Sequence, residues 1–427
     1  MDWKRIRTGF VLAFASHLHA QPEMRLTLAE ARRLAVQNNP QFASARLDAA
    51  AAYQVPNEYR ANYQPNLYTS VTGVGADTGS RIAAGALNNP VVYNRLGSGM
   101  SIAQMITDFG RTGNLVAMAD LRAKAQDQAA EATRSNILLA TDRAYFSVLR
   151  AQAVLKVARQ TVEARQLVVD QVTALAESKL KSTLDLSFAK VNLADARLLL
   201  AQALNDLKAT QADLGTAMGL PGETAFLLED EPMPTPLPDR VEPLISQALQ
   251  ERPELRDLRL EQSAAERFAK AEHALYFPSV GLVGTAGFVP TGQEAIPGRY
   301  GAVGVNVTIP IFNGGLYKAR TAEARLKAQA TTQRIRDLEN RVTRDVRVAF
   351  LNANTAYDRV GLTAQLLDQA SLALDLAQSR YDLGLGSIVE LSQAQLNLTS
   401  AQIANSSARF EYQTQRSVVE YQIGALH

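Results

Sequence analysis

Few of the residue types that carry out chemistry occur in this sequence of 427 residues. Cysteine is absent, which excludes thiolate catalysis, disulfide bonds and thiolate metal sites. Of the four histidines, His17 and His19 lie near the N-terminus, which leaves His273 and His427. Histidine is the commonest general acid–base residue and a frequent ligand of transition metals. The sequence therefore predicts no cofactor and no metal centre, and it disfavours an enzyme.

A glycine-rich turn and scattered carboxylates are the remaining candidates for chemistry. The turn 312–315, Phe-Asn-Gly-Gly, precedes a predicted helix but lacks the G-x-G-x-x-G spacing and the strand–helix–strand context of a phosphate site. The carboxylates are spread along predicted helical faces without a recognisable acid/base pair. Asp185 and Glu390 end the helix-capping sequences 182–185 and 387–390, S-x-x-D and S-x-x-E. Both carboxylates therefore have a structural role in the first instance.

The charges of the chain nearly cancel. There are 44 basic and 42 acidic residues, and the formal net charge is +2. No block of lysine and arginine is long enough to form a polyanion-binding arm. We therefore expect no nucleic-acid partner.

The N-terminus has the pattern of a secretory signal peptide. Basic residues precede a short apolar run at 9–15, and the small residue Ala20 follows. We expect residues 1–20 to be removed by cleavage after Ala20. Beyond them, no stretch approaches the ~18–20 consecutive apolar residues of a membrane-spanning helix. Any crossing of a membrane must therefore use strands.

The chain contains two copies of one pattern, which organises the whole sequence. We expect a first repeat at residues 21–220, a linker rich in proline and acidic residues at 221–238, and a second repeat at 239–427. The matching positions are Pro40 and Pro253, and Pro65 and Pro278, each pair 213 apart, and then Asp108 and Asn313, and Asn192 and Asn397, each pair 205 apart. The change of eight residues falls in one connecting loop.

Each copy begins with a helix that a proline interrupts. Capping boxes at residues 27–30 and 239–242 predict the helix starts. Pro40 and Pro253 predict a bend between two helical pieces. The hydrophobic period then changes from about 3.6 to 2, which predicts strands. The predicted strand pairs are residues 66–75 and 93–106, and residues 279–289 and 300–310, joined by loops at 76–92 and 290–299.

Each copy ends in a predicted coiled-coil hairpin. From Val342 to Tyr381, apolar or small residues recur at alternating steps of four and three, which is a heptad seam. The matching positions from 137 to 176 follow the same pattern, with Arg165 as the exception. At ~1.5 Å per residue such a helix is a rod of roughly 100 Å. The two hairpins are predicted at about residues 111–218 and 315–424, with returning helices from about 183 and 388.

Four strands are too few to close a membrane barrel. The smallest barrels need about eight strands, and an open sheet edge is forbidden in lipid. Two chains would supply eight strands around a filled interior, and three would supply twelve with room for a lumen. The alanine-rich seams also need neighbours on more than one side. The sequence therefore predicts an oligomer.

The order of these elements resembles the TolC-like outer-membrane efflux protein family across nearly the whole mature chain. The resemblance rests on short motifs in a fixed order, given twice. They are residues 26–31, Leu-Thr-Leu-Ala-Glu-Ala; the breaks at Asn39-Pro40 and Arg252-Pro253; Tyr-x-Pro at residues 63–65 and 276–278; residues 309–315, Ile-Pro-Ile-Phe-Asn-Gly-Gly; and Tyr381, Gly384 and Ser387 at steps of three.

The resemblance implies a fold class that is mainly α with a small transmembrane β part. Duplicated helix–ββ–long helix–helix units would form, as a homotrimer, a 12-stranded β-barrel continued by a long α-helical coiled-coil barrel. The protein would lie in the outer membrane, in contact with its lipid, with a long periplasmic extension. It would be the passive exit duct of a tripartite efflux pump, joined to a periplasmic adaptor protein and an inner-membrane transporter.

Two other functions stay open from the sequence. The first is a type I secretion channel that exports polypeptides. The second is a trimeric coiled-coil adhesin or scaffold, which would have no use for paired strands with an apolar outer face.

The resemblance also assigns roles at the ends of the hairpins. Glu390 matches the first of the family's acidic pore-gate residues, and Gln393 stands at the place of the second. Tyr381 and Asp185 occupy the places of a family latch between neighbouring hairpins. A second family latch, between an arginine and a threonine, falls on Gly386 and Leu184 and is missing. The expected adaptor contacts are the tip residues Lys179, Leu180, Lys181, Ser182, Gly384, Leu385, Gly386 and Ser387.

Overall fold

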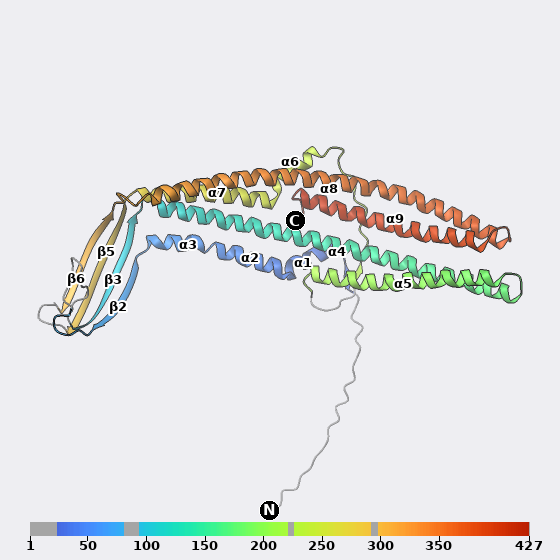
Figure 1. Cartoon of the computed structure of the whole chain (residues 1–427), viewed down its shortest axis with the longest axis horizontal. Helices are drawn as coiled ribbons and strands as arrows, with labels where there is room; N and C mark the ends of the chain where they lie inside the picture. Colours follow the sequence, from blue (N-terminus) through green and yellow to red (C-terminus); the bar gives the residue numbers. More distant parts are fainter. Residues whose placement is uncertain (1–23, 81–93, 221–225, 292–297, 427) are drawn as a thin grey trace, which may run out of the picture. The chain divides into compact units, whose positions relative to one another are not determined.

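The computed structural model describes residues 24–80, 94–220, 226–291 and 298–426 (Figure 1). The chain forms two compact units, each built from three segments. The first unit comprises Met1–Gln37, Thr141–Met233 and Leu362–Phe410, and the second comprises Asn38–Ala140, Pro234–Gly361 and Glu411–His427. The expected signal peptide, residues 1–20, lies outside the described residues, as do residues 81–93 and 292–297 of the expected loops and 221–225 of the expected linker.

The two halves of the chain share one order of elements, except that three helices precede the strand pair in the first half and two precede it in the second. The first half contains β1 (Met24–Leu26), α1 (Leu28–Asn38), α2 (Pro40–Ala52), α3 (Val55–Arg60), β2 (Asn66–Val74), β3 (Arg95–Thr107), α4 (Arg111–Glu177) and α5 (Thr183–Ala217). The second half contains β4 (Phe226–Leu228), α6 (Glu242–Glu251), α7 (Pro253–His273), β5 (Ser279–Thr291), β6 (Arg299–Thr308), α8 (Leu316–Asp382) and α9 (Ile388–Gln422). The expected fold class of duplicated helix, strand-pair and long-helix units is confirmed.

Both prolines separate helices as expected. Pro40 begins α2, and the side chain of Asn39 caps this helix by accepting from the backbone N–H of Gln41 at 2.9 Å. Arg252 has an extended backbone before Pro253, the conformation that a following proline imposes. Proline is tolerated in the first turn of a helix but blocks its continuation from the previous turn.

One of the two expected capping boxes is present. Thr27 and Glu30 exchange side-chain and backbone hydrogen bonds at the start of α1. The box expected at residues 239–242 is wrong, because α6 begins only at Glu242 and its N-cap is Val241, whose side chain makes no capping hydrogen bond. Pro243 explains the later start, since its ring fits only in the first turn.

The four long strands form one antiparallel sheet in the second unit, in the order β2-β3-β5-β6 (Figure 1). Each hairpin pairs its own two strands, and β3 pairs with β5 to join the two hairpins. Register shifts between Leu96 and Ser98 and between Met105 and Thr107 interrupt the central ladder. Strands β2 and β6 therefore lie at the two edges of the sheet.

The long helices follow the predicted heptad seam. Helices α4 and α8 have 67 residues each, and the returning helices α5 and α9 have 35 each. Along α8 the seam residues from Val342 to Tyr381 are buried or half-buried while most residues between them are exposed. Arg165, the exception to the seam pattern, is nevertheless buried on α4. The described helices include none that is both long and apolar enough to cross a membrane.

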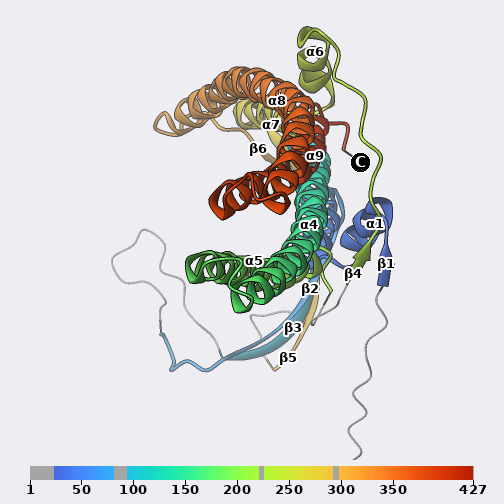
Figure 2. The ribbon, with the colours of Figure 1, turned by 90° about the vertical axis from the view of Figure 1, so that its right-hand side faces the viewer.

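Strand β1 is held in the first unit by a group of contacts that we call the Tyr145 clamp, formed by Leu26, Tyr145 and Glu229. Strand β1 pairs in parallel with β4, beside α1 and α4 (Figure 2). The hydroxyl of Tyr145 on α4 donates to the carbonyls of Leu26 and Glu229, at 3.0 and 2.7 Å. Nearby, Arg32 forms a bidentate ion pair with the fully buried Asp142. Its Nε and one terminal nitrogen donate to the two carboxylate oxygens at 2.7 and 2.6 Å. The sequence pattern gave no indication of β4, which lies in the expected linker.

Each unit has its own apolar core. In the second unit, α6 and α7 pack on the middle of α8 and the end of α9 through Leu244, Leu255, Val346 and Val419. In the first unit, α4, α5, α8 and α9 share a cluster that includes Val172, Leu193, Tyr381 and Leu391. The ends of both hairpins are therefore packed together within the first unit.

Candidate functional site

The sheet has an exposed apolar face suited to lipid. On β6 the valines point outward and are strongly exposed, with Val303 at 81%. Just beyond the strand, Ile311 is 93% exposed. Aromatic residues gather where the strands meet the helices, among them Phe109 and Phe277, whose ring centroids are 6.3 Å apart. Apolar strand faces bordered by aromatic residues are typical of strands in outer membranes.

The opposite face of the sheet carries small and polar residues. Tyr300, at the far end of β6, lies on this face across the neighbouring strands. A Cβ atom added at Gly99 or Gly287 would meet the Tyr300 ring, so the two glycines make room for it. Gly99 pairs with Gly287, and Gly287 pairs with Tyr300, across three adjacent strands. The tyrosine ring is thus held against the sheet.

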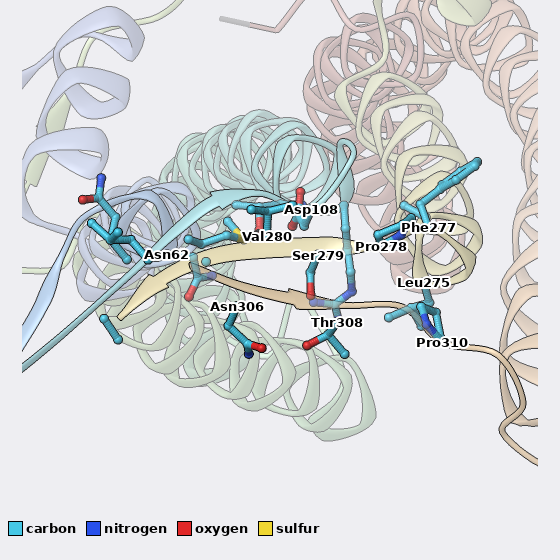
Figure 3. A pocket seen from close by; sticks show the side chains of 18 of the residues that line it. Asn62, Asp108, Leu275, Phe277, Pro278, Ser279, Val280, Asn306, Thr308 and Pro310 are labelled. Carbon is cyan, nitrogen blue, oxygen red and sulfur yellow. Dashed lines mark hydrogen bonds between the residues drawn. The ribbon is translucent and has the colours of Figure 1, made fainter. Parts of the chain in front are cut away.

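A polar cavity of about 530 Å³ lies where the strands pass into the helices (Figure 3). Asn62, Asp108, Asn306 and Thr308 line it from different elements. Asp108 also accepts a hydrogen bond at 2.7 Å from the backbone N–H of Thr112 and so caps the start of α4. Apolar side chains of the strands and of the neighbouring helix ends also line the cavity. Among the described residues there is no group of three or more side chains able to hold a metal ion.

The tip of the first hairpin is a tight turn between α4 and α5. Lys179 has a left-handed backbone, with φ of 59°. The N–H groups of Leu180 and Lys181 both donate to the carbonyl of Leu175 and close the end of α4. Ser182 and Asp185 then form a complete capping box, with hydrogen bonds of 3.1 and 3.2 Å. The Asp185 carboxylate thus has the structural role expected from the sequence.

The tip of the second hairpin closes differently. Gly384 takes the left-handed conformation, with φ of 73°. The hydroxyl of Ser387 accepts from the N–H of Glu390 at 3.1 Å, as in the expected capping sequence. The carboxylate of Glu390 accepts from the Nε of Arg380 at 3.0 Å. This ion pair was not expected from the sequence, which gave Glu390 a capping role and, by resemblance, a place at the pore gate.

Tyr381 lies in the buried cluster that joins the two hairpin ends. Its ring faces the ammonium of Lys181, 4.2 Å from the ring centroid. Burial raises the pKa of the Tyr381 phenol, and the nearby charge of Asp185 raises it further. The hydroxyl has no hydrogen-bond partner among the described residues. A pairing of Tyr381 with Asp185 therefore stays a prediction.

A polar layer lies further along the same packed hairpins. The guanidinium of Arg165 donates to Gln395, and burial lowers the pKa of this arginine. The side-chain amide of Asn192 donates to the Ser392 hydroxyl at 2.7 Å. Gln393 lines the same pocket as Arg165 and Asn192, and it donates to Asn397 on its own helix at 2.9 Å. The hairpins are thus joined by hydrogen bonds as well as by apolar contacts.

An antiparallel sheet with an apolar face and two long helical hairpins defines a class of protein, the outer-membrane channels with a helical extension. Comparisons with known proteins agree. The outer membrane efflux protein family model matches residues 31–220 and 244–422. The chain belongs to this family. It is therefore an outer-membrane efflux channel with a periplasmic helical extension, and a channel rather than an enzyme.

Individual relatives are distant in sequence but close in fold. The chain is 24% identical over 404 residues to the outer membrane protein TolC of Salmonella enteritidis, covering 91% of this chain and 80% of TolC. It is 24% identical to the toluene efflux pump outer membrane protein TtgC of Pseudomonas putida, covering 81% and 73%. A crystal structure of CusC matches with a TM-score of 0.81 at 18% identity, covering 99% of both chains.

Proposed function

We propose that this protein is the exit duct of a tripartite efflux pump and passively conducts drugs or other small molecules to the exterior. The observation that carries the proposal is the four-stranded sheet, with two edge strands and an apolar face, joined in each half to a long helical hairpin. An open edge is not tolerated in lipid. Edge pairing between copies, β6 of one with β2 of the next, makes three chains a closed ring of twelve strands.

We infer the protein partners of the channel from the exposed ends of the hairpins. The tip side chains Leu180 and Leu385 are about 70% exposed, at 71% and 68%. Exposed leucines on rigid turns suit contact with another protein. We place a periplasmic adaptor there, and the adaptor joins the channel to an inner-membrane transporter that supplies energy and selects the cargo.

We propose that the gate of the channel lies at the same ends of the hairpins. Tyr381 lies in the cluster where the two hairpins pack together, and Asp185, Glu390 and Gln393 stand within two residues of cluster members along α5 and α9. In this proposal they surround the narrowest part of the periplasmic entrance. Replacing Asp185 and Glu390 with alanine is then expected to change the conductance of the channel.

The test uses purified protein in planar lipid bilayers. Discrete pores from a trimeric species support the proposal, and their conductance should change in the D185A/E390A variant. A protein that is fully extracted without detergent, or that forms no pores, would contradict it. Unchanged conductance and cation preference in the variant would reject the pore role of the two carboxylates alone.

The partners are tested by site-directed cross-linking in cells. Because the chain has no cysteine, single cysteines at Leu180 or Leu385 are unique attachment points. A cysteine at the exposed Asp239, before α6, serves as the control. Capture of an adaptor from the tips and not from position 239 supports the proposal. Cross-linking to a secreted polypeptide in transit would favour the secretion channel instead.

A further inference from the structure

The ion pair between Arg380 and Glu390 is fixed to the tip of the second hairpin at several points. The Nε of Arg380 donates to the Glu390 carboxylate at 3.0 Å, and a terminal nitrogen donates to the Leu385 carbonyl at 3.2 Å. In return, the N–H groups of Leu385 and Gly386 donate to the Arg380 carbonyl at 2.8 and 3.0 Å. Arg380 therefore spans the turn and holds the carboxylate from the same chain.

Gly386 is packed against this pair. A Cβ atom added at Gly386 would lie 3.2 Å from the Cβ of Arg380 and 3.3 Å from an oxygen of Glu390. Contacts of that length require the neighbours to move. The glycine thus lets the turn approach the ion pair.

The charges around both tips also balance. The two segments 177–190 and 380–393 carry four cations and four anions. The cations are Lys179, Lys181, Lys190 and Arg380, and the anions are Glu177, Asp185, Asp382 and Glu390. Two opposite charges held about 3 Å apart act on a distant ion as a weak dipole. Such a pair attracts cations much less than a lone carboxylate does.

We propose that Arg380 sets the ion selectivity of the periplasmic entrance by cancelling the charge of Glu390, so that the channel discriminates weakly between cations and anions. This inference rests on the proposed function, in which Glu390 faces the entrance. Arg380 is then a specificity-determining residue, and it acts on the permeating ion through the carboxylate that it holds. Gly386 has a positioning role, because it leaves room for the pair.

The test measures the reversal potential of the purified channel in planar bilayers under a KCl gradient. The wild-type reversal potential is expected close to zero. Arg380→Gln exposes Glu390 and should shift it toward the potassium equilibrium potential, with at least about a threefold rise in the ratio of potassium to chloride permeability at low salt. Glu390→Gln exposes Arg380 and should shift it in the opposite direction.

Two further variants distinguish an effect of the charges of Arg380 and Glu390 from an effect of structural damage at the tip. Arg380→Lys keeps the cation and should retain the wild-type reversal potential. The double variant R380Q/E390Q lacks both charges and should also return to it, which a merely damaged tip would not do. A strongly cation-selective wild type that Glu390→Gln neutralises, with Arg380→Gln unchanged, would overturn the inference while leaving the channel function intact. A wild-type protein without pores would overturn both.

Discussion

The two halves of the chain have the same backbone conformation at their turns but reach it with different residues. At the strand-to-helix turn Phe109 has φ of 53°, and Gly314, 205 residues later, has φ of 64°. At the hairpin tip Lys179 and Gly384, again 205 residues apart, have φ of 59° and 73°. In the described chain, Phe109 and Lys179 are the only residues other than glycine with positive φ.

The comparison teaches that the duplicated fold fixes the path of the backbone more strictly than the side chains. A left-handed backbone costs an ordinary residue about 1–2 kcal/mol and glycine much less. The first half retains two such residues where the second half has glycine. The tips differ in their carboxylates as well, since Asp185 caps its helix while Glu390 is held by Arg380. Exchanging residues between matching positions therefore tests whether the two halves respond differently to the same side chain.

The largest loss of stability is expected when the heptad seam of α8 receives an arginine at the position that matches Arg165 of α4. Arg165 is buried with Gln395 as its partner, and the matching position on α8 is the buried Ala370. Ala370→Arg should destabilise the protein by about 3 kcal/mol or more, because it overpacks the seam with an uncompensated charge. Loss of helical circular dichroism on heating in detergent measures this. The neighbouring exposed Gln369→Arg is the control, and equal melting of both variants would contradict the prediction.

An exchange at the hairpin turns should have an intermediate effect. Gly384→Lys puts a side chain on a left-handed backbone and should cost roughly 1–2 kcal/mol. The reverse exchange, Lys179→Gly, should stabilise by about 0.5 kcal/mol after the added flexibility of glycine in the unfolded chain is counted. The melting temperatures of the two variants, compared with that of the wild type, measure both changes in stability. Shifts of the same sign would show that the two turns are not equivalent.

A smaller effect is expected at the helix starts after the tips. Asp185→Ala removes half of a capping box and should weaken the first turn of α5 by about 1 kcal/mol. Glu390→Ala leaves the Ser387 cap in place and should weaken the first turn of α9 by about 0.5 kcal/mol, through the helix dipole. The rates of amide hydrogen exchange in the first turns of α5 and α9 measure the two losses of stability. Faster exchange in α9 than in α5 would reverse the expected order.

The last effect should depend on pH. Burial raises the pKa of Asp257 on α7 to about 6, and the charges of Glu261 and Glu254 add to it. The folded state thus binds the proton more tightly than the unfolded state, so this stabilisation is complete below about pH 4 and lost as the pH rises to about 6. Asp257→Ser, which copies Ser44 of the first half, should raise the melting temperature at pH 8 and not at pH 4. A gain at both pH values would exclude titration of Asp257 as the cause.

The repeated architecture could be predicted from the sequence because it rests on periodicity. The heptad steps from Val342 to Tyr381 follow from which face of α8 is buried, and the alternation on β6 follows from one apolar face and one face of mostly small and polar residues. Strand β4 could not be predicted, because three residues in a proline-rich stretch carry no period. It forms because β1 supplies its partner.

The details of the candidate site were less predictable for a similar reason. Arg165 interrupts the seam pattern, and its partner Gln395 is 230 positions away in the chain. Glu390 fits a capping sequence, which gives no sign that Arg380 holds its carboxylate. Such contacts depend on where the returning helix places a side chain, and the hydrophobic pattern alone does not encode that.

The Tyr145 clamp sets an order of events during synthesis. Leu26 pairs with Leu228, 202 positions later, and Tyr145 joins both partner segments. The hairpin contacts between α4 and α5 are far more local, and local contacts form faster. Strand β1 therefore cannot pair until the first hairpin has folded and residues 226–229 have been synthesised. Until then the backbone groups of β1 are unpaired and open to other strands, which is a risk of misassembly that the separation of 202 positions creates.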